Sequence, residues 1–408
     1  MRIVSLLAQT RCGIYQFHCN LSRGLAQRGC KVTWLCSGSV HARLIATDGA
    51  EPTEGEVVAP DTDDLGARTR AIVEQIREIS PDVILCQGVG DRIDFNAIRY
   101  LPDSIPKILI LHGSTLAVYR CARAVRDYVN ATVAISPRIE EDLCSTYEFQ
   151  KDTVKLIPHG IDTAAFSALP LRESNTGPLR ILSHGRIDKS QKGVLWLPEI
   201  LVEVARHSEE WSCTVSGDGP DLEELKRRID RNGMSSRVQF AGWTAAEKVP
   251  ELMRQHDIFL FPSQWEGYPI ALIEAMAAGC APVASRLPGI TDWIIQDGVN
   301  GLLFPIGDVR QAAQHLLVLL SDRRKLDELR QRAHEAVSGY SLDWMADQYY
   351  RLLCEVRSDP RPTRPAESLD DCALAEGLRP GWWYGLPEPV KSRLRLVRER
   401  LRSSVKVP

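Results

Sequence analysis

Residues 2–37, RIVSLLAQTRCGIYQFHCNLSRGLAQRGCKVTWLCS, hold two short apolar runs with a longer amphipathic stretch between them. The runs at 2–8 and 31–37 have the length and composition of buried strands, whereas 13–29 has helical periodicity. A strand, a helix and a second strand in this order are typical of a βαβ unit, in which the two strands are parallel. This stretch therefore predicts an α/β fold.

The same alternation continues along most of the chain. In the first half, strands are expected at 82–88, 107–113 and 131–136 and helices at 64–79 and 116–129. After 168–178, which has the composition of a linker, strands are expected at 179–185, 212–219, 237–242, 257–263 and 281–285, with helices at 192–207, 221–232, 245–255, 269–278 and 308–320. We predict two Rossmann-like domains, 1–167 and 179–340, and a closing helix at 341–356 that returns to the first domain.

Composition narrows the class of protein. The 408 residues carry 50 basic and 53 acidic side chains, a net charge of −3, which argues against a protein built to attract nucleic acid. The 11 cysteines are odd in number and lie in apolar runs without metal-ligand spacing, so we interpret them as buried thiols in a reducing cytoplasm. The N-terminus is a poor signal peptide and no apolar run has the length of a membrane span, so we expect a cytoplasmic protein.

The end of the chain differs from the body. Residues 357–370 are rich in proline and predict a tether or an extended surface segment. Residues 391–408 carry seven Lys or Arg against one Glu, and helical periodicity places four apolar residues on one face: Leu394, Val397, Leu401 and Val405. Trp382, Trp383 and Tyr384 lie just upstream. Two interpretations stay open: residues 381–408 contact an anionic membrane surface, or they form a solvated helix packed on the body.

One cluster of candidate site residues follows the expected strand 257–263. It runs EGYPIALIE from Glu266 to Glu274. Pro269 fits a first helical turn, which leaves backbone N–H groups around 269–271 able to hold a phosphate. Glu274, one turn into that helix, can accept hydrogen bonds from two ribose hydroxyls, and Glu266 can reach a sugar hydroxyl or a developing positive charge.

A second cluster, LSHGRIDKSQKG at 182–193, runs from the end of the expected strand 179–185 into the loop that follows it. Arg186 and Lys192 are predicted to end the strand and open a helix, where two cations can neutralise a diphosphate. Lys189 is a weaker third candidate. Gly217 belongs to a Gly-Asp-Gly turn that either lets the backbone approach a nucleotide or is a plain turn.

Taken in order, Arg186, Lys192-Gly193, the turn at 217–219 and the run 266–274 resemble the retaining glycosyltransferases of family 4 over about residues 1–355. The resemblance implies the GT-B fold, in which two Rossmann-like domains with parallel sheets face each other across a cleft. It also implies a nucleotide-sugar donor in the C-terminal domain, with Arg186 and Lys192 on its diphosphate. Glu274 would then bind the ribose and Glu266 the donor sugar.

In the N-terminal domain, the resembling family carries a Gly-rich loop after the first strand. Here that loop is 9–14, with Gly13 as its one glycine. His112 follows the strand-like run KILIL, and the resemblance places it beside the donor sugar as an orienting or proton-managing residue. His159 stands where the family usually has Asn, and both His159 and His184 are weaker catalytic candidates.

The sequence therefore predicts a retaining, metal-independent hexosyltransferase that moves a sugar from a nucleoside diphosphate to a hydroxyl acceptor. No cofactor is expected, and the acceptor is expected to be a glycan or lipid-linked glycan of surface polysaccharide assembly. The predicted catalytic residues are His112, Glu266, Arg186 and Lys192, and the predicted donor-binding residues are Gly13, Arg186, Lys192, Gly217, Tyr268, Pro269, Ile270, Ala271 and Glu274. Two alternatives remain: a GT-B epimerase or phosphorylase, and a catalytically silent nucleotide-sugar-binding subunit.

Overall fold

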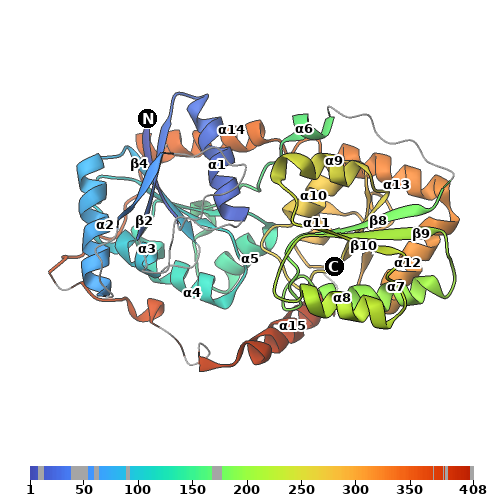
Figure 1. Ribbon diagram of the computed structural model, residues 1–408. Helices are drawn as coiled ribbons and strands as arrows, with labels where there is room; N and C mark the ends of the chain where they lie inside the picture. Colours follow the sequence, from blue (N-terminus) through green and yellow to red (C-terminus); the bar gives the residue numbers. More distant parts are fainter. Residues whose placement is uncertain are drawn as a thin grey trace. The chain divides into compact units, whose positions relative to one another are not determined.

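The computed structural model describes residues 1–7, 13–37, 54–58, 64–88, 92–167, 177–370, 372–379, 381 and 385–404. Its internal contacts divide the chain into two units, each built from two segments (Figure 1). Unit 1 comprises Met1–Gly160 and Leu342–Tyr384, and unit 2 comprises Ile161–Ser341 and Gly385–Pro408. Each unit contains a parallel sheet with helices packed against it.

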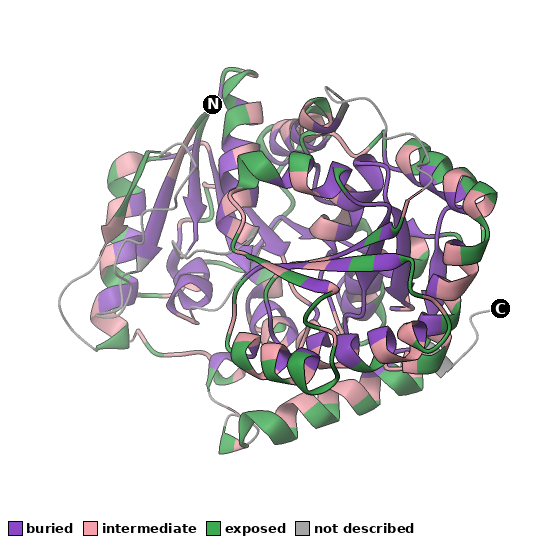
Figure 2. Cartoon of the chain, turned by 45° about the vertical axis from the view of Figure 1, so that its right-hand side comes forward, coloured by how far each residue is buried: buried purple, intermediate pink, exposed green. Residues whose placement is uncertain are grey.

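The sheet of unit 1 has the strand order β3-β2-β1-β4-β5-β6-β7. Its strands are β1 (Arg2–Leu6), β2 (Lys31–Ser37), β3 (Gly55–Val58), β4 (Val83–Gly88), β5 (Lys107–Leu111), β6 (Ala131–Ala134) and β7 (Val154–Leu156). Ile3 of β1 pairs with Val32 on one side and Val83 on the other, so the strand order reverses between β1 and β4. Both faces of the central strands are covered, and Figure 2 shows them mostly in purple, the colour of buried residues.

The helices of unit 1 connect these strands. They are α1 (Gly13–Ala26), α2 (Leu65–Ile79), α3 (Arg92–Ala97), α4 (Leu116–Val125), α5 (Pro137–Ser145) and, from the second segment, α14 (Leu342–Ser358). Asp64 caps α2, because its carboxylate accepts a hydrogen bond from the Gly66 amide at 2.9 Å. Thr115 caps α4 through its hydroxyl in the same way.

Unit 2 repeats the arrangement with the strand order β10-β9-β8-β11-β12-β13. Its strands are β8 (Leu179–His184), β9 (Trp211–Ser216), β10 (Val238–Gly242), β11 (Ile258–Phe261), β12 (Ala281–Ser285) and β13 (Leu302–Phe304). Its helices are α6 (Thr163–Ser167), α7 (Leu197–Ala205), α8 (Leu222–Arg231), α9 (Val249–Arg254), α10 (Ile270–Ala277), α11 (Thr291–Ile294), α12 (Val309–Ser321), α13 (Arg323–Ala336) and α15 (Glu388–Ser404). The order reverses between β8 and β11.

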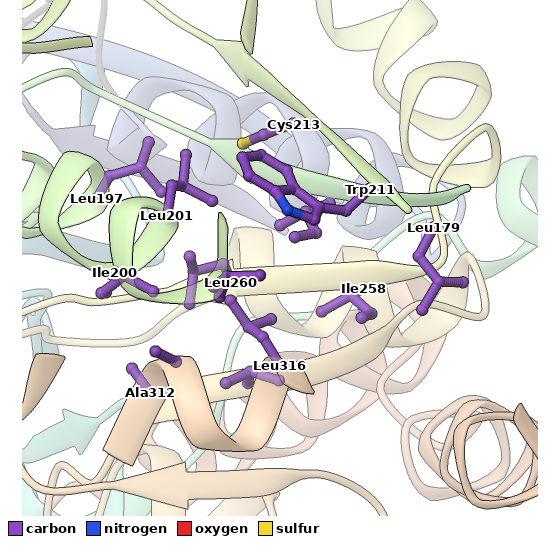
Figure 3. Close-up of a cluster of buried hydrophobic side chains, with 14 of the residues drawn as sticks. Leu179, Leu197, Ile200, Leu201, Trp211, Cys213, Ile258, Leu260, Ala312 and Leu316 are labelled. Atoms are coloured by element: carbon purple, nitrogen blue, oxygen red, sulfur yellow. The ribbon is translucent and has the colours of Figure 1, made fainter. Parts of the chain in front are cut away.

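One face of the unit 2 sheet carries a large apolar core. Trp211 and Cys213 of β9 and Leu260 of β11 pack against α7 and α12 (Figure 3). These side chains are almost fully buried, and burying one Leu or Ile contributes roughly 1.5–3 kcal/mol. The continuous apolar runs of the sequence thus become central strands that are buried on both faces.

The predicted α/β class and most of the predicted elements are confirmed. The prediction for the helix 192–207 was wrong at its start, because the chain makes turns through 189–193 and a 3₁₀ turn at Val194–Trp196 before α7 begins at Leu197. Several elements had no counterpart in the prediction: β3, β7 and β13, which are only three or four residues long, and α3, α5, α6, α11 and α13.

The Pro-rich segment after α14 is fastened to unit 1, as expected of an extended surface segment. The Asn130 side chain donates to the Arg361 carbonyl at 2.8 Å. Arg99 and the Tyr128 hydroxyl both bind the Glu367 carboxylate, and the Tyr100 hydroxyl donates to the Ala373 carbonyl at 3.0 Å. These bonds hold the segment along the side of unit 1 that contains β6 and the turn after α3.

Helix α14 packs closely on α1 although 315 residues lie between them in the chain. Arg28 donates to Asp343 at 2.7 Å, to Asp347 at 2.8 Å and to the Gly24 carbonyl at 2.7 Å. A Cβ atom at Gly24 would lie 2.5 Å from the Cβ of Ala346, which is closer than real side chains approach. The contact therefore requires glycine on α1.

Gly24→Ala is expected to lower the midpoint of thermal unfolding. In a helix interior, replacing Gly by Ala ordinarily stabilises by about 1 kcal/mol, but here the added methyl overlaps Ala346 and overpacking costs about 1–3 kcal/mol. Gly339→Ala is the matched control, because a Cβ there meets no atom within 4 Å. Unchanged or raised stability of Gly24→Ala would contradict this packing.

Candidate functional site

The loops after β8 and β11 carry the candidate site of unit 2. These two strands are neighbours at the point where the strand order reverses, and α/β sheets bind ligands at the carboxyl ends of their strands at such a point. The loop after β8 contains Arg186 and Lys192, and the loop after β11 contains Glu266. Sequence analysis placed these three residues in a site, and the structure brings them into one network.

Lys192 and Glu266 form a buried ion pair at the centre of this network. The Lys192 ammonium lies 2.6 Å from Glu266 Oε1, and the two side chains are 20% and 4% exposed. The Ser263 hydroxyl donates to the same oxygen at 2.7 Å, and the ammonium lies 5.5 Å from the centre of the Phe261 ring. Glu266 thus holds Lys192 in place. The sequence analysis predicted a contact of Glu266 with the donor sugar but did not predict this ion pair.

Arg186 joins the network through Asp188 and Gln191. Its guanidinium donates to Asp188 at 2.5 Å and to the Gln191 side-chain oxygen at 3.4 Å, while the Gln191 amide donates to Glu266 at 3.4 Å. Burial opposes ionisation of Asp188, but hydrogen bonds from Ser190 and the charge of Arg186 outweigh it and lower the Asp188 pKa. The Arg186 side chain is 59% exposed, so it faces solvent while its carboxylate partner is fixed.

The backbone explains why the loop after β8 can place Lys192 here. Gly193 has φ +59°, and a Cβ at this position would lie 2.1 Å from the Pro262 carbonyl oxygen. Only glycine permits that approach, which sets the loop after β8 against the loop after β11. The prediction that Lys192 opens a helix was wrong: this residue lies in the loop, before the 3₁₀ turn at Val194–Trp196.

Gly217 has a structural role in the same region. Its φ is +134°, and a Cβ there would lie 1.9 Å from the Gly185 carbonyl oxygen. The loop after β9 therefore packs backbone to backbone against the loop that carries Arg186. Lys189, the weaker third cation of the sequence analysis, pairs with Asp221 at 3.1 Å in this area.

Helix α10 presents the second predicted cluster. Pro269 precedes the helix as its N-cap and not within its first turn, and α10 begins at Ile270. The Ile270 amide already donates to the Tyr268 carbonyl at 3.1 Å, and the Tyr268 side chain is buried beside Trp293. Burial raises the Glu274 pKa to about 7.

In unit 1, His112 follows β5 and both of its ring nitrogens are engaged. Nε2 lies 2.6 Å from Gln87 Oε1, which can only accept, so this nitrogen carries the proton. Nδ1 then accepts from His159 Nε2 at 3.1 Å. The Phe17 ring stacks on His159 with centroids 4.4 Å apart. Gln87 therefore sets the tautomer of His112, and His159, which donates to the other ring nitrogen, is a positioning residue.

The remaining predicted residues fall into two groups. Gly13 begins α1, and residues 9–12 of the expected Gly-rich loop lie outside the described part of the chain. His184 ends β8, where Nδ1 lies 3.1 Å from the Ser216 hydroxyl, and burial together with the Lys192 charge lowers its pKa to about 4. Among the described residues, no group of three or more His, Cys, Asp or Glu side chains is arranged as a metal site.

Sequence analysis missed the residues that orient the predicted ones. These residues are Asp188, Gln191, Ser263 and Gln87. Two of them carried a signal, since Asp188 and Gln191 lie inside the quoted run that follows β8. Gln87 is the second-last residue of β4, whose neighbour β5 precedes His112, so the strand order was needed to find it.

Comparison with known families covers both units. The model described as Glycosyltransferase Family 4 matches residues 13–165, and the model described as Glycosyl transferases group 1 matches residues 178–322. Together they span most of both Rossmann-like folds. The chain is a GT-B glycosyltransferase of the family 4 kind, as the sequence motifs predicted.

Individual relatives agree with this assignment. The chain is 27% identical over 299 residues to a sulfoquinovosyl transferase of Arabidopsis thaliana, covering 67% of this chain and 56% of that protein. It is 30% identical over 266 residues to a phosphatidyl-myo-inositol mannosyltransferase of Mycolicibacterium smegmatis, covering 60% and 64%. In each case the match spans less than two thirds of the relative. The fold of Anabaena HepE, solved in complex with UDP-glucose, superposes with a TM-score of 0.70 at 18% identity, covering 87% of this chain and 100% of that one.

The buried histidines of unit 1 are expected to make the protein sensitive to acid. Burial lowers the pKa of His159 to about 3, and burial together with His159 lowers the pKa of His112 well below its usual value. Between about pH 6.5 and these values the unfolded chain binds more protons than the folded one, so stability falls as pH falls. His159→Asn should reduce this slope in thermal unfolding followed from pH 7 to pH 4.

His207→Asn is the control, because that histidine side chain is 59% exposed. An equal slope in the wild-type and His159→Asn proteins would contradict the burial of an uncharged His159.

Proposed function

We propose that this protein is a retaining glycosyltransferase that transfers a hexosyl group from a nucleoside-diphosphate sugar to a hydroxyl acceptor. The observation that carries the proposal is the network of Arg186, Gln191, Glu266 and Lys192 at the strand-order reversal of unit 2. Family membership supplies the reaction class, and this network supplies the charge that the reaction requires.

The two cations are proposed to stabilise the leaving diphosphate. As the bond between the sugar and the phosphate breaks, negative charge grows on the phosphate oxygens, and fixed cations lower the energy of that state. Arg186 and Lys192 each contact a carboxylate in the structure, at 2.5 and 2.6 Å. A bound diphosphate would share these cations, with Asp188 and Glu266 keeping them oriented. We propose that no divalent metal is needed.

Retention of configuration is proposed to follow from attack on the same face of the sugar that the diphosphate leaves. The leaving phosphate then takes the proton of the acceptor hydroxyl, so no strong side-chain base is required. His112 suits an orienting role, because both of its ring nitrogens are already bonded within unit 1.

The ribose of the donor is proposed to bind Glu274. Two adjacent hydroxyls can donate to one ionised carboxylate, and Glu274 lies on α10 just beyond Tyr268 and Pro269. The raised pKa of about 7 means that an appreciable fraction of Glu274 is protonated near neutral pH. A ligand that needs the ionised form must therefore compete with a proton.

The acceptor is proposed to be a lipid-linked glycan of surface polysaccharide assembly, used by a cytoplasmic protein at the inner face of the membrane. The name of the mycobacterial relative, a phosphatidyl-myo-inositol mannosyltransferase, supports a lipid acceptor. In the part of the chain that the structure describes, no helix has both the length and the apolar character needed to cross a bilayer.

The decisive experiment screens UDP-, GDP- and ADP-sugars by thermal shift and then follows transfer to a lipid extract. Transfer of labelled sugar with release of nucleoside diphosphate supports the proposal. Release of nucleotide without transfer would favour an epimerase or a hydrolytic activity, phosphate-dependent cleavage would favour a phosphorylase, and binding without turnover a silent subunit.

Arg186→Ala and Lys192→Ala are each expected to lower kcat/KM by about 10²–10³, since each removes a charge that stabilises the transition state. His159→Ala should cost less, because His159 acts through His112. Lys189→Ala is the matched control in the same loop, since Lys189 pairs with Asp221. Full activity of Arg186→Ala would contradict the proposed role of this cation in stabilising the leaving diphosphate.

Affinity for the nucleoside diphosphate is expected to rise with pH through about 7. With a pKa of about 7, ionised Glu274 rises about tenfold between pH 6 and pH 8, and the dissociation constant should fall by a similar factor. Isothermal titration of wild type and Glu274→Gln checks this. The phosphate titrates in both proteins, so an identical pH profile would show that Glu274 does not bind the ribose.

A further inference from the structure

Helix α15 has an inner side that packs on unit 2. Leu396 joins an apolar cluster formed by Leu287, Ile290 and Ile306. The Arg395 guanidinium lies 5.6 Å from the centre of a Trp265 ring, and the Arg400 Nε donates to the Ile306 carbonyl at 3.2 Å. These contacts attach the helix to the donor-binding unit.

The outer side of α15 carries a stripe of exposed apolar residues. Val390, Leu394, Val397 and Leu401 are 43%, 55%, 50% and 66% exposed. Their spacing of four, three and four residues puts them on one line along the helix. In the described part of the chain only three other large apolar side chains are exposed, and they lie elsewhere: Leu65, Trp243 and Trp344. Figure 2 accordingly shows α15 almost entirely in green and pink.

Basic side chains border this stripe on both sides. Between 388 and 402, six Lys or Arg residues stand against two Glu. At about 100° per residue, Lys391, Arg398 and Arg402 lie on one side of the stripe and Arg393 lies on the other, next to Arg400, which bonds inward to the Ile306 carbonyl. Lys391 pairs with Glu388 and Arg398 pairs with Glu399, at 3.6 and 3.0 Å. Glu399 is buried on the opposite, inner side. The helix therefore offers a wide positive face with an apolar centre.

We propose that the outer side of α15 is a docking surface for an anionic lipid bilayer. In such a complex the apolar stripe enters the boundary between head groups and acyl chains, and the flanking guanidinium groups meet lipid phosphates. The helix would lie parallel to the membrane plane. Its inner contacts keep it on unit 2, so the membrane would hold the unit that binds the donor. Docking would bring the donor-binding unit to a lipid-linked acceptor in the bilayer, and in this respect the inference rests on the proposed function.

A second copy of the chain fits this surface less well. A symmetric dimer through the stripe would bring the basic borders of two copies together, and like charges repel. Four side chains are also few for a stable interface, which usually buries about 800 Å² on each partner. An anionic bilayer, in contrast, complements both the charge and the apolar centre.

The residues upstream of the helix that sequence analysis linked to a membrane, Trp382, Trp383 and Tyr384, lie outside the described part of the chain, and so does Val405. The described residues of α15 carry the docking surface by themselves. The sequence analysis left two interpretations open, membrane contact and packing on the body. In the structure Leu396 packs inward on unit 2 and Leu394 is exposed, so packing on the body leaves the outer side of the helix open to the proposed membrane contact.

The test is sedimentation of the full chain with vesicles of phosphatidylcholine alone or mixed equally with phosphatidylglycerol. We expect binding to the anionic vesicles that falls with salt, and at least tenfold weaker partitioning for the triple variant Leu394→Ser, Val397→Ser, Leu401→Ser. Arg393→Gln with Arg402→Gln should weaken binding and its dependence on salt. Trp243→Ser, which removes a 60% exposed apolar residue elsewhere on unit 2, should bind as wild type does.

Thermal unfolding and nucleotide binding of the triple variant should match wild type, because the three residues face away from the unit 2 core. Vesicle binding by the triple variant equal to that of wild type would overturn the proposal. A wild-type dimer that the triple variant converts to monomers, without vesicle binding by either, would assign the stripe to self-association. Vesicle binding by a protein that binds no nucleotide would leave the docking surface standing and remove the proposed function.

Discussion

The reversal of strand order between β8 and β11 is the constraint on which the candidate site depends. At this point the two neighbouring loops leave the sheet toward opposite faces, so neither covers the other's strand end. Polar side chains in the loops that follow these buried strands can therefore still reach solvent. Gly193 sets how near the two loops come, because its missing side chain admits the Pro262 carbonyl. A larger residue there would separate Lys192 from Glu266.

The carboxylates of the candidate site orient its cations. Lys192 is mostly buried and pairs with Glu266, whereas Arg186 is largely exposed and pairs with Asp188. A buried ion pair is costly to desolvate, and it persists only where further hydrogen bonds satisfy it, as Ser263 does here. One cation is thus held rigidly and the other has room to adjust, a division that would suit the diphosphate binding proposed above.

Sequence patterns predicted the fold well where strands were long and buried. Continuous apolar runs identified β1, β2, β4 and β5, but β7 and β13 have only three residues each and leave too short a pattern. For the site, the motif residues could be found from their position after buried strands and from the family resemblance, whereas their partners depended on distance in space. His112 and His159 are 47 residues apart, and no local pattern indicates that their rings bond. In α15 the helical wheel located the apolar stripe, but only Leu396 and its contacts showed which side faces inward.

The division of each unit between two segments affects how the chain is made. Unit 1 takes residues 342–384 from beyond unit 2, and unit 2 takes α15 from beyond those. During synthesis from the N-terminus, α1 therefore leaves the ribosome long before α14 exists to cover Gly24 and bind Arg28. Domains generally fold in the order of synthesis, but here the first unit to begin cannot be completed until the second has been almost wholly translated. In this interval the face of α1 that later packs on α14 stays uncovered.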